Sequence, residues 1–176
     1  KISADNMQKE IEALNVYKLN QFKINLELRI KEIENLASLL NVDNKLSPYN
    51  LDDSEYKRIE GIEQIGAYRS QNAFISDYYL YMKKSGKVYS MDGQSSISTF
   101  AKSIYNLSHS NVSDFIEKAR NLKVPTFLGK EWFESNSTKS VDYISYMYPI
   151  SYGNYDPYGI VILHIKKSKI SEMLKN

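Results

Sequence analysis

Two histidines are the residues of this 176-residue chain whose chemistry best suits acid–base catalysis. His109 lies in the polar run 108–111, and His164 alternates with Ile160 and Ile162 along an apolar stretch. A nucleophile–histidine–aspartate relay needs three groups that converge in space. Such proximity cannot be read from these spacings, and we interpret both histidines as structural.

The carboxylates show no spacing that indicates catalysis. Asp52 and Asp53 precede a predicted helix, whose N-terminus they would stabilise. Glu131 and Glu134 could form a general acid–base pair, but two carboxylates at this spacing are common on any protein surface. The chain has no cysteine, which excludes a thiolate nucleophile, a zinc knuckle and disulfide bonds. It also lacks the phosphate-binding glycine loops, HExxH and the EF-hand spacing. The sequence therefore predicts neither an enzyme nor a cofactor.

Tyrosine is the unusual feature, with 15 copies in the chain. Ten of them fall in or beside predicted strands: Tyr78, Tyr79, Tyr81, Tyr89, Tyr143, Tyr146, Tyr148, Tyr152, Tyr155 and Tyr158. Tyrosine and tryptophan combine an apolar body with a hydrogen-bonding tip, which suits a cavity for a small amphipathic molecule. The alternative is that these tyrosines pack along strands and keep their hydroxyls in water.

The first forty residues carry apolar side chains at steps of three and four, which predicts one helix. The pattern has a single slip in phase, between Tyr17 and Phe22, and neither Gly nor Pro interrupts it. Such a helix spans about 60 Å, longer than a compact domain of this size needs. We expect part of it to project from the body and to pack against its counterpart in a homodimer.

The remaining elements predict an α+β fold, in which an antiparallel sheet is flanked by helices. The hydrophobic period changes from helical to two at Phe74, where strand alternation begins. The predicted elements are helix 54–69, a hairpin of strands 74–82 and 88–91, helices 96–105 and 112–121, a short strand 125–129, strands 141–150 and 158–166, and helix 168–176.

Composition and charge exclude other classes. A net charge of +2 without any basic block does not favour nucleic acid as a partner. No apolar run approaches the roughly 20 residues that cross a bilayer. The chain begins at Lys1, so we expect it to be a piece of a longer protein.

The order of elements resembles the Cache superfamily of PAS-like sensor domains. The resemblance rests on the long helix, the hairpin, the insert containing Trp132, the strand end Tyr148-Pro149-Ile150, and the closing segments 158–165 and 169–174. The Arg-x-Trp-Tyr motif of amino-acid-binding members is matched by Lys130-Glu131-Trp132-Phe133, with lysine in place of the arginine.

Membership would imply three parts: a long membrane-proximal and dimerisation helix at 1–47, a PAS-like sensor domain at 48–167, and the start of an exit helix at 168–176. It would imply an extracytoplasmic domain of a bacterial membrane receptor, joined to transmembrane helices outside this chain. We expect it to bind a small solute between the sheet and the helical insert, and to feed a histidine kinase or an AraC-type regulator rather than a chemoreceptor. The candidate ligand-binding residues are Lys130, Trp132, Phe133, Tyr146 and Tyr148.

Two alternatives from other classes stay open. A pilin-like surface protein would use the long helix to assemble a filament. A pilin, however, ends in its sheet, whereas this sequence predicts a closing helix at 168–176. A cell-surface carbohydrate-binding module would use the tyrosines as stacking platforms.

Overall fold

The fold is a six-stranded antiparallel sheet with helices on both faces. The computed structural model describes residues 2–105, 107, 111–129 and 143–175. The strands are β1 (Ile75–Met82), β2 (Lys87–Ser90), β3 (Gly93–Ser96), β4 (Thr126–Leu128), β5 (Tyr143–Ile150) and β6 (Gly159–Lys166), in the spatial order β3-β2-β1-β6-β5-β4. The predicted α+β class is confirmed.

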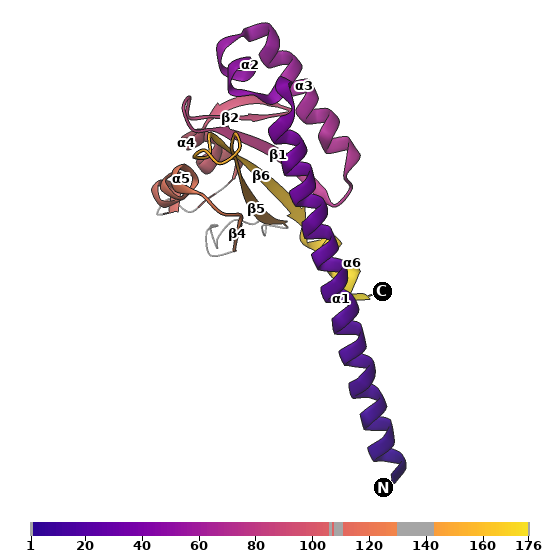
Figure 1. Ribbon diagram of the computed structural model, residues 1–176. Helices are drawn as coiled ribbons and strands as arrows, with labels where there is room; N and C mark the ends of the chain where they lie inside the picture. The colour runs from indigo at the N-terminus through magenta and orange to yellow at the C-terminus, as the bar shows by residue number, and fades with distance from the viewer. Residues whose placement is uncertain (1, 106, 108–110, 130–142, 176) are drawn as a thin grey trace.

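The helices frame this sheet (Figure 1). They are α1 (Ile2–Val42), the 3₁₀ turn η1 (Asn44–Leu46), α2 (Pro48–Asp53), α3 (Glu55–Gln71), α4 (Ile97–Thr99), the π-helical segment η2 (Phe100–Ile104), α5 (Val112–Asn121) and α6 (Lys167–Lys175). Helices α1, α2 and α3 cover one face, and the insert of α4, η2 and α5 covers the other.

Helix α1 confirms the prediction of one long N-terminal helix, with 41 residues. Its C-terminal half packs on the sheet, where Ile33, Ala37 and Leu40 are buried. Its N-terminal half extends beyond the body (Figure 1), and its side chains there are exposed. The phase slip between Tyr17 and Phe22 therefore separates an exposed apolar stripe from the stripe that packs on the domain. Among the described helices, none combines the length and the apolarity needed to cross a membrane.

Serine caps start the two helices that follow α1. The Ser47 side chain accepts a hydrogen bond from the backbone N–H of Asn50, and the Ser54 side chain accepts one from the backbone N–H of Lys57. Each bond satisfies one of the amide donors left open at a helix start. The helix predicted at 54–69 is α3, whereas α2, only six residues long, was not predicted.

The three central strands β1, β6 and β5 form the longest strand pairings of the sheet. Strand β6 pairs with β1 along one edge and with β5 along the other, and because helices cover both faces of the sheet, seven of its eight residues are buried. Gly159 permits this close pairing, because a Cβ at that position would lie 2.6 Å from the Tyr81 carbonyl oxygen. Strand β3 was not predicted, because its residues Gly93–Ser96 are small and polar and show no apolar alternation.

Two hydrophobic cores lie on the two faces of the sheet. The first joins α1 and α3 to alternate strand residues such as Leu80, Val161 and Leu163. The second core joins the insert to the strand residues that alternate with those of the first core, such as Tyr81 and Ile162. Because neighbouring strand residues point to opposite faces, a shift of one strand moves side chains in both cores.

Candidate ligand-binding site

Two buried polar side chains lie side by side on the sheet face that the insert covers. Ser145 of β5 is directly opposite His164 of β6 in the strand register. Both are almost fully buried, with 0% and 2% of their surface exposed. His164 Nε2 makes no hydrogen bond within the described residues, whereas Ser145 is a side-chain hydrogen-bond partner of Tyr105. Because a buried polar atom without a partner costs about 1–3 kcal/mol, the His164 imidazole favours a role in binding.

Aromatic rings surround the His164 imidazole. Tyr143 stacks on it at a centroid distance of 4.0 Å, and Tyr105 lies parallel to it at 5.1 Å. Tyr79 of β1 is tilted against it at 4.9 Å and also contacts Phe100 at 4.8 Å. The rings come from β1, β5, β6 and the end of η2, so the fold gathers residues that are distant in sequence. We call Tyr79, Tyr105, Tyr143, Ser145 and His164 the sheet cluster.

The sheet cluster is uncharged at neutral pH. Burial lowers the pKa of His164 to about 3, which keeps the imidazole neutral. Burial also raises the pKa of Tyr143 to about 12 and that of Tyr79 above its ordinary value. A general acid or base works best with a pKa near the operating pH. His164 is far from that range, so the cluster suits hydrogen bonding and stacking rather than proton transfer.

Charged groups near the cluster lie beside the N-terminal part of β1. The Asp77 carboxylate faces Arg69 of α3 at 3.4 Å, and Arg69 Nε also donates to the Ser76 carbonyl. A cavity of about 70 Å³ is lined by Tyr79, Asp92 and Phe100, among others. Within the described residues, His, Asp and Glu side chains do not gather in the groups of three that hold a metal ion.

No protein-family model and no curated protein matches the sequence. Solved structures match it at 13–16% identity. The extracellular domain of a protein described as a histidine kinase gives a TM-score of 0.58 at 16% identity, over 97% of this chain and 61% of that one. The sensory domain of a Campylobacter jejuni chemoreceptor with isoleucine bound gives 0.55 at 13%, over 91% and 63%. A domain of a sensory box/GGDEF family protein from Vibrio parahaemolyticus gives 0.58 at 16%, over 97% and 64%.

The chain has the fold of Cache sensor domains. The predicted resemblance is thereby confirmed at the level of the fold. The chain spans less than two thirds of each of these three chains. The predicted boundaries at 47/48 and 167/168 stay predictions.

The Cache fold places two of the predicted ligand-binding residues on the face of α1. The Tyr146 hydroxyl donates to Glu34 Oε1 at 3.1 Å, and Tyr148 packs in the same core. Strand alternation explains this, since Tyr143 and Ser145 point to the insert and Tyr146 and Tyr148 point away from it. Their contact with a ligand stays a prediction. Lys130, Trp132 and Phe133 lie outside the described residues, and their role also stays a prediction.

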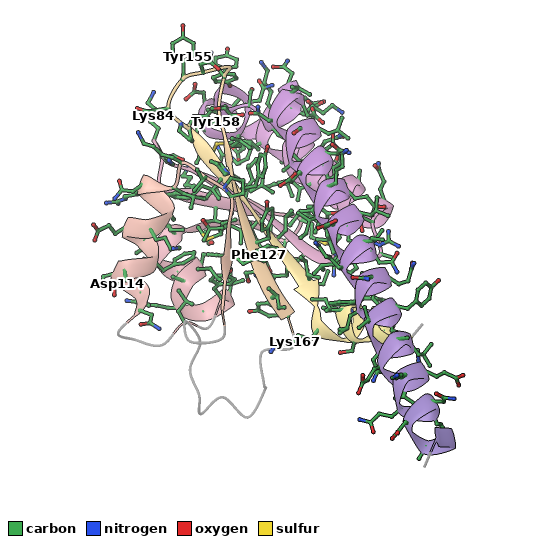
Figure 2. The ribbon with its side chains drawn as sticks, turned by 60° about the horizontal axis from the view of Figure 1, so that its bottom comes forward. Lys84, Asp114, Phe127, Tyr155, Tyr158 and Lys167 are labelled. Atoms are coloured by element: carbon green, nitrogen blue, oxygen red, sulfur yellow. The ribbon has the colours of Figure 1, made fainter. Side chains whose placement is uncertain are left out.

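Several tyrosines instead form hydrogen bonds to α1 and to the turn that follows it. Besides Tyr146, the Tyr68 hydroxyl donates to Asp43 and the Tyr158 hydroxyl donates to Asn41 Oδ1, both at 2.9 Å. Figure 2 shows Tyr158 at the end of the sheet, with Tyr155 farther out at the tip of the turn. The aromatic enrichment thus serves two purposes, a ring cluster on one face and a set of hydrogen bonds to the helix on the other.

Sequence reasoning missed Ser145, Tyr105 and the ring cluster around His164. A small polar residue inside the aromatic strand 143–150 was a usable signal for Ser145. The alternation of His164 with Ile160 and Ile162 was recognised, and all three do point to the insert. Tyr105 gave no signal, because only the folded chain brings it to the sheet.

Proposed function

We propose that this chain is the extracytoplasmic ligand-binding domain of a bacterial membrane receptor. The observation that carries the proposal is the sheet cluster, where His164 Nε2 is buried beneath the insert without a partner among the described residues, directly opposite the buried Ser145. The Cache fold supports it, since the matched structures include sensory domains and one holds isoleucine. The domain itself has no catalytic role in this proposal.

The ligand in this proposal is a small amphipathic solute. Neutral hydroxyls and an imidazole would hydrogen-bond to its polar part, and the rings of Tyr79, Tyr105 and Tyr143 would contact its apolar part. Lys130, Trp132 and Phe133 would complete the site from the segment that follows β4. No cofactor is needed, because binding alone supplies the signal.

Strand β5 would pass the signal to the long helix. It presents Tyr143 and Ser145 to the solute and, on its other face, Tyr146 to Glu34 of α1. A solute that prefers one position of β5 would shift α1 accordingly. The signal would then reach a histidine kinase or an AraC-type regulator, favoured over a chemoreceptor, across the membrane through flanking helices outside this chain.

A thermal-shift screen of amino acids, organic acids, sugars and short peptides tests the proposal. A ligand that binds only the folded chain, at about 100 times its Kd, adds about 2.7 kcal/mol to the free energy of unfolding. For a domain of this size we expect the midpoint to rise by roughly 5–10 °C for members of one solute class. A flat response in every class would count against the proposed function.

The proposal includes a homodimer through α1. Between residues 7 and 28, α1 exposes apolar side chains at steps of three, four and seven: Met7, Ile11, Leu14, Tyr17, Ile24 and Leu28, each 49–62% exposed. This spacing is typical of a helix that packs against another helix. The stripe lies on a different side of α1 from Ile33, Ala37 and Leu40, which face the sheet.

Sedimentation equilibrium measures this dimer. We expect the chain to associate reversibly, and a variant with Leu14→Glu and Leu28→Glu to stay monomeric because a buried carboxylate is strongly disfavoured in such a seam. A variant with Lys23→Glu, which changes the net charge by the same amount on the opposite side of α1, should still associate. Equal behaviour of all three proteins would argue against α1 as the interface.

A further inference from the structure

A second cavity lies at the foot of the domain, away from the sheet cluster. It has a volume of about 410 Å³, within the range of small-molecule sites. Helix α1, the connection from α3 to β1, and helix α6 line it. Figure 1 shows α6 beside the middle of α1, where the body ends and the free part of α1 begins.

Two ion pairs face this cavity, one on each helix. Arg29 contacts Glu32 at 2.7 Å on α1, and Lys169 contacts Glu172 at 3.1 Å on α6. The four side chains are between 40% and 58% exposed. Exposed ion pairs contribute little to stability. A ligand carboxylate can therefore replace Glu32 beside Arg29, and a ligand ammonium group can approach Glu172, at little cost.

The floor of the cavity is apolar. Phe74 is 9% exposed, and Arg29 Cζ lies 5.9 Å from the centre of its ring, which holds the guanidinium in place by a cation–π contact. Met173 packs at the edge of the same core. The amide of Phe74 donates to Asn72 Oδ1 at 2.9 Å, which fixes the connecting loop. Helix α3 ends at Gln71, so its carbonyl end favours a positive group nearby.

We propose that this cavity is a second solute site, selective for a zwitterionic α-amino acid with an aliphatic or thioether side chain. Arg29 and Lys169 recognise the carboxylate, Glu172 recognises the ammonium group, and Phe74 with Met173 contacts the side chain. The site lies between α1 and α6. Its occupation therefore sets the spacing of the two helices independently of the sheet cluster. This inference goes beyond the proposed function and uses none of its residues.

NMR titration of the ¹⁵N-labelled chain with L-methionine tests the inference. We expect amide shifts that saturate in the segment 71–74 and in α6. N-acetyl-L-methionine and L-methionine amide each lack one charge and should bind at least about tenfold more weakly. Arg29→Gln and Lys169→Gln should each weaken L-methionine binding by about the same factor. Lys23→Gln removes a more exposed charge of α1 outside the cavity and should not.

Three results would overturn this site. One is shifts confined to β5 and β6, which would assign the amino acid to the sheet cluster and support only the proposed function. Another is L-methionine binding by Arg29→Gln and Lys169→Gln at the strength of the parent chain. The third is the absence of shifts up to the solubility limit of L-methionine, which leaves the proposed function untouched because that function rests on a different site.

Discussion

Replacing Phe115 by alanine is expected to lower the free energy of unfolding by about 3–5 kcal/mol. Phe115 of α5 is completely buried, and its ring lies 5.2 Å from that of Tyr105 and 6.3 Å from that of Phe100. The ten-residue helix α5 is too short to be stable alone, so its packing against the sheet holds it in place. Removing this ring leaves a cavity in the core that connects the insert to the sheet cluster.

Urea denaturation measures this loss, with Phe127→Ala as the matched control. Phe127 of β4, labelled in Figure 2, is 46% exposed. Its ring packs against Tyr146, on the face of the sheet opposite the insert. The same substitution there should cost about 1 kcal/mol, because less surface leaves water on folding. Equal losses in the two variants would contradict the placement of Phe115 in a closed core beneath the insert.

Replacing His164 by leucine is expected to abolish most solute binding while leaving the fold intact or making it more stable. The imidazole Nε2 is buried and lacks a partner among the described residues, and this costs stability in the free protein. Leucine removes that cost of about 1–3 kcal/mol but loses the stacking with Tyr143, worth about 0.5–1.5 kcal/mol. At neutral pH the free energy of unfolding should therefore equal that of the parent chain or exceed it by about 1 kcal/mol.

The solute identified by the screen should bind this variant about 10–100-fold more weakly, as measured by calorimetry. The loss follows because leucine cannot form the hydrogen bond that the solute makes with the buried imidazole. A large loss of stability together with unchanged affinity would mean that His164 is a structural residue, as its sequence context first indicated.

The stability difference between the parent chain and His164→Leu should also depend on pH. Burial lowers the pKa of His164 to about 3, whereas an unfolded histidine titrates near 6.5. Between these values the unfolded state binds a proton that the folded state does not. The parent chain therefore loses stability as the pH falls from about 6.5 towards 3, at up to about 1.4 kcal/mol per pH unit from this group. The variant lacks this loss, so its relative stability should grow on acidification.

The hydrophobic periods predicted the main elements. The steps of three and four over the first forty residues predicted α1, and the change at Phe74 predicted the β1–β2 hairpin. These local patterns decide which side of an element is apolar, so they survive in the fold. They also contained the phase slip after Tyr17. Only the fold shows that the apolar residues before this slip are exposed, whereas those near the C-terminus of α1 pack on the sheet.

The site was harder to predict, because it depends on strand parity and on contacts between distant segments. Tyr146 and Tyr148 looked equivalent to Tyr143 in composition, yet a shift of an odd number of residues reverses the face of the sheet. Tyr105 and His164 are 59 positions apart and meet only through the insert. The lone histidine of the last strand looked like an ordinary core residue, because its missing partner is a property of the folded state.

The most direct test of the account is the NMR signal of the His164 imidazole, followed as the solute from the screen is added. The chain has only two histidines, and the His164→Leu variant assigns the signal. We expect the Nε2 resonance of His164 to shift on saturation, because the nitrogen gains a hydrogen bond to the solute. Binding that calorimetry detects but that leaves this resonance unmoved would contradict the sheet cluster as the ligand site.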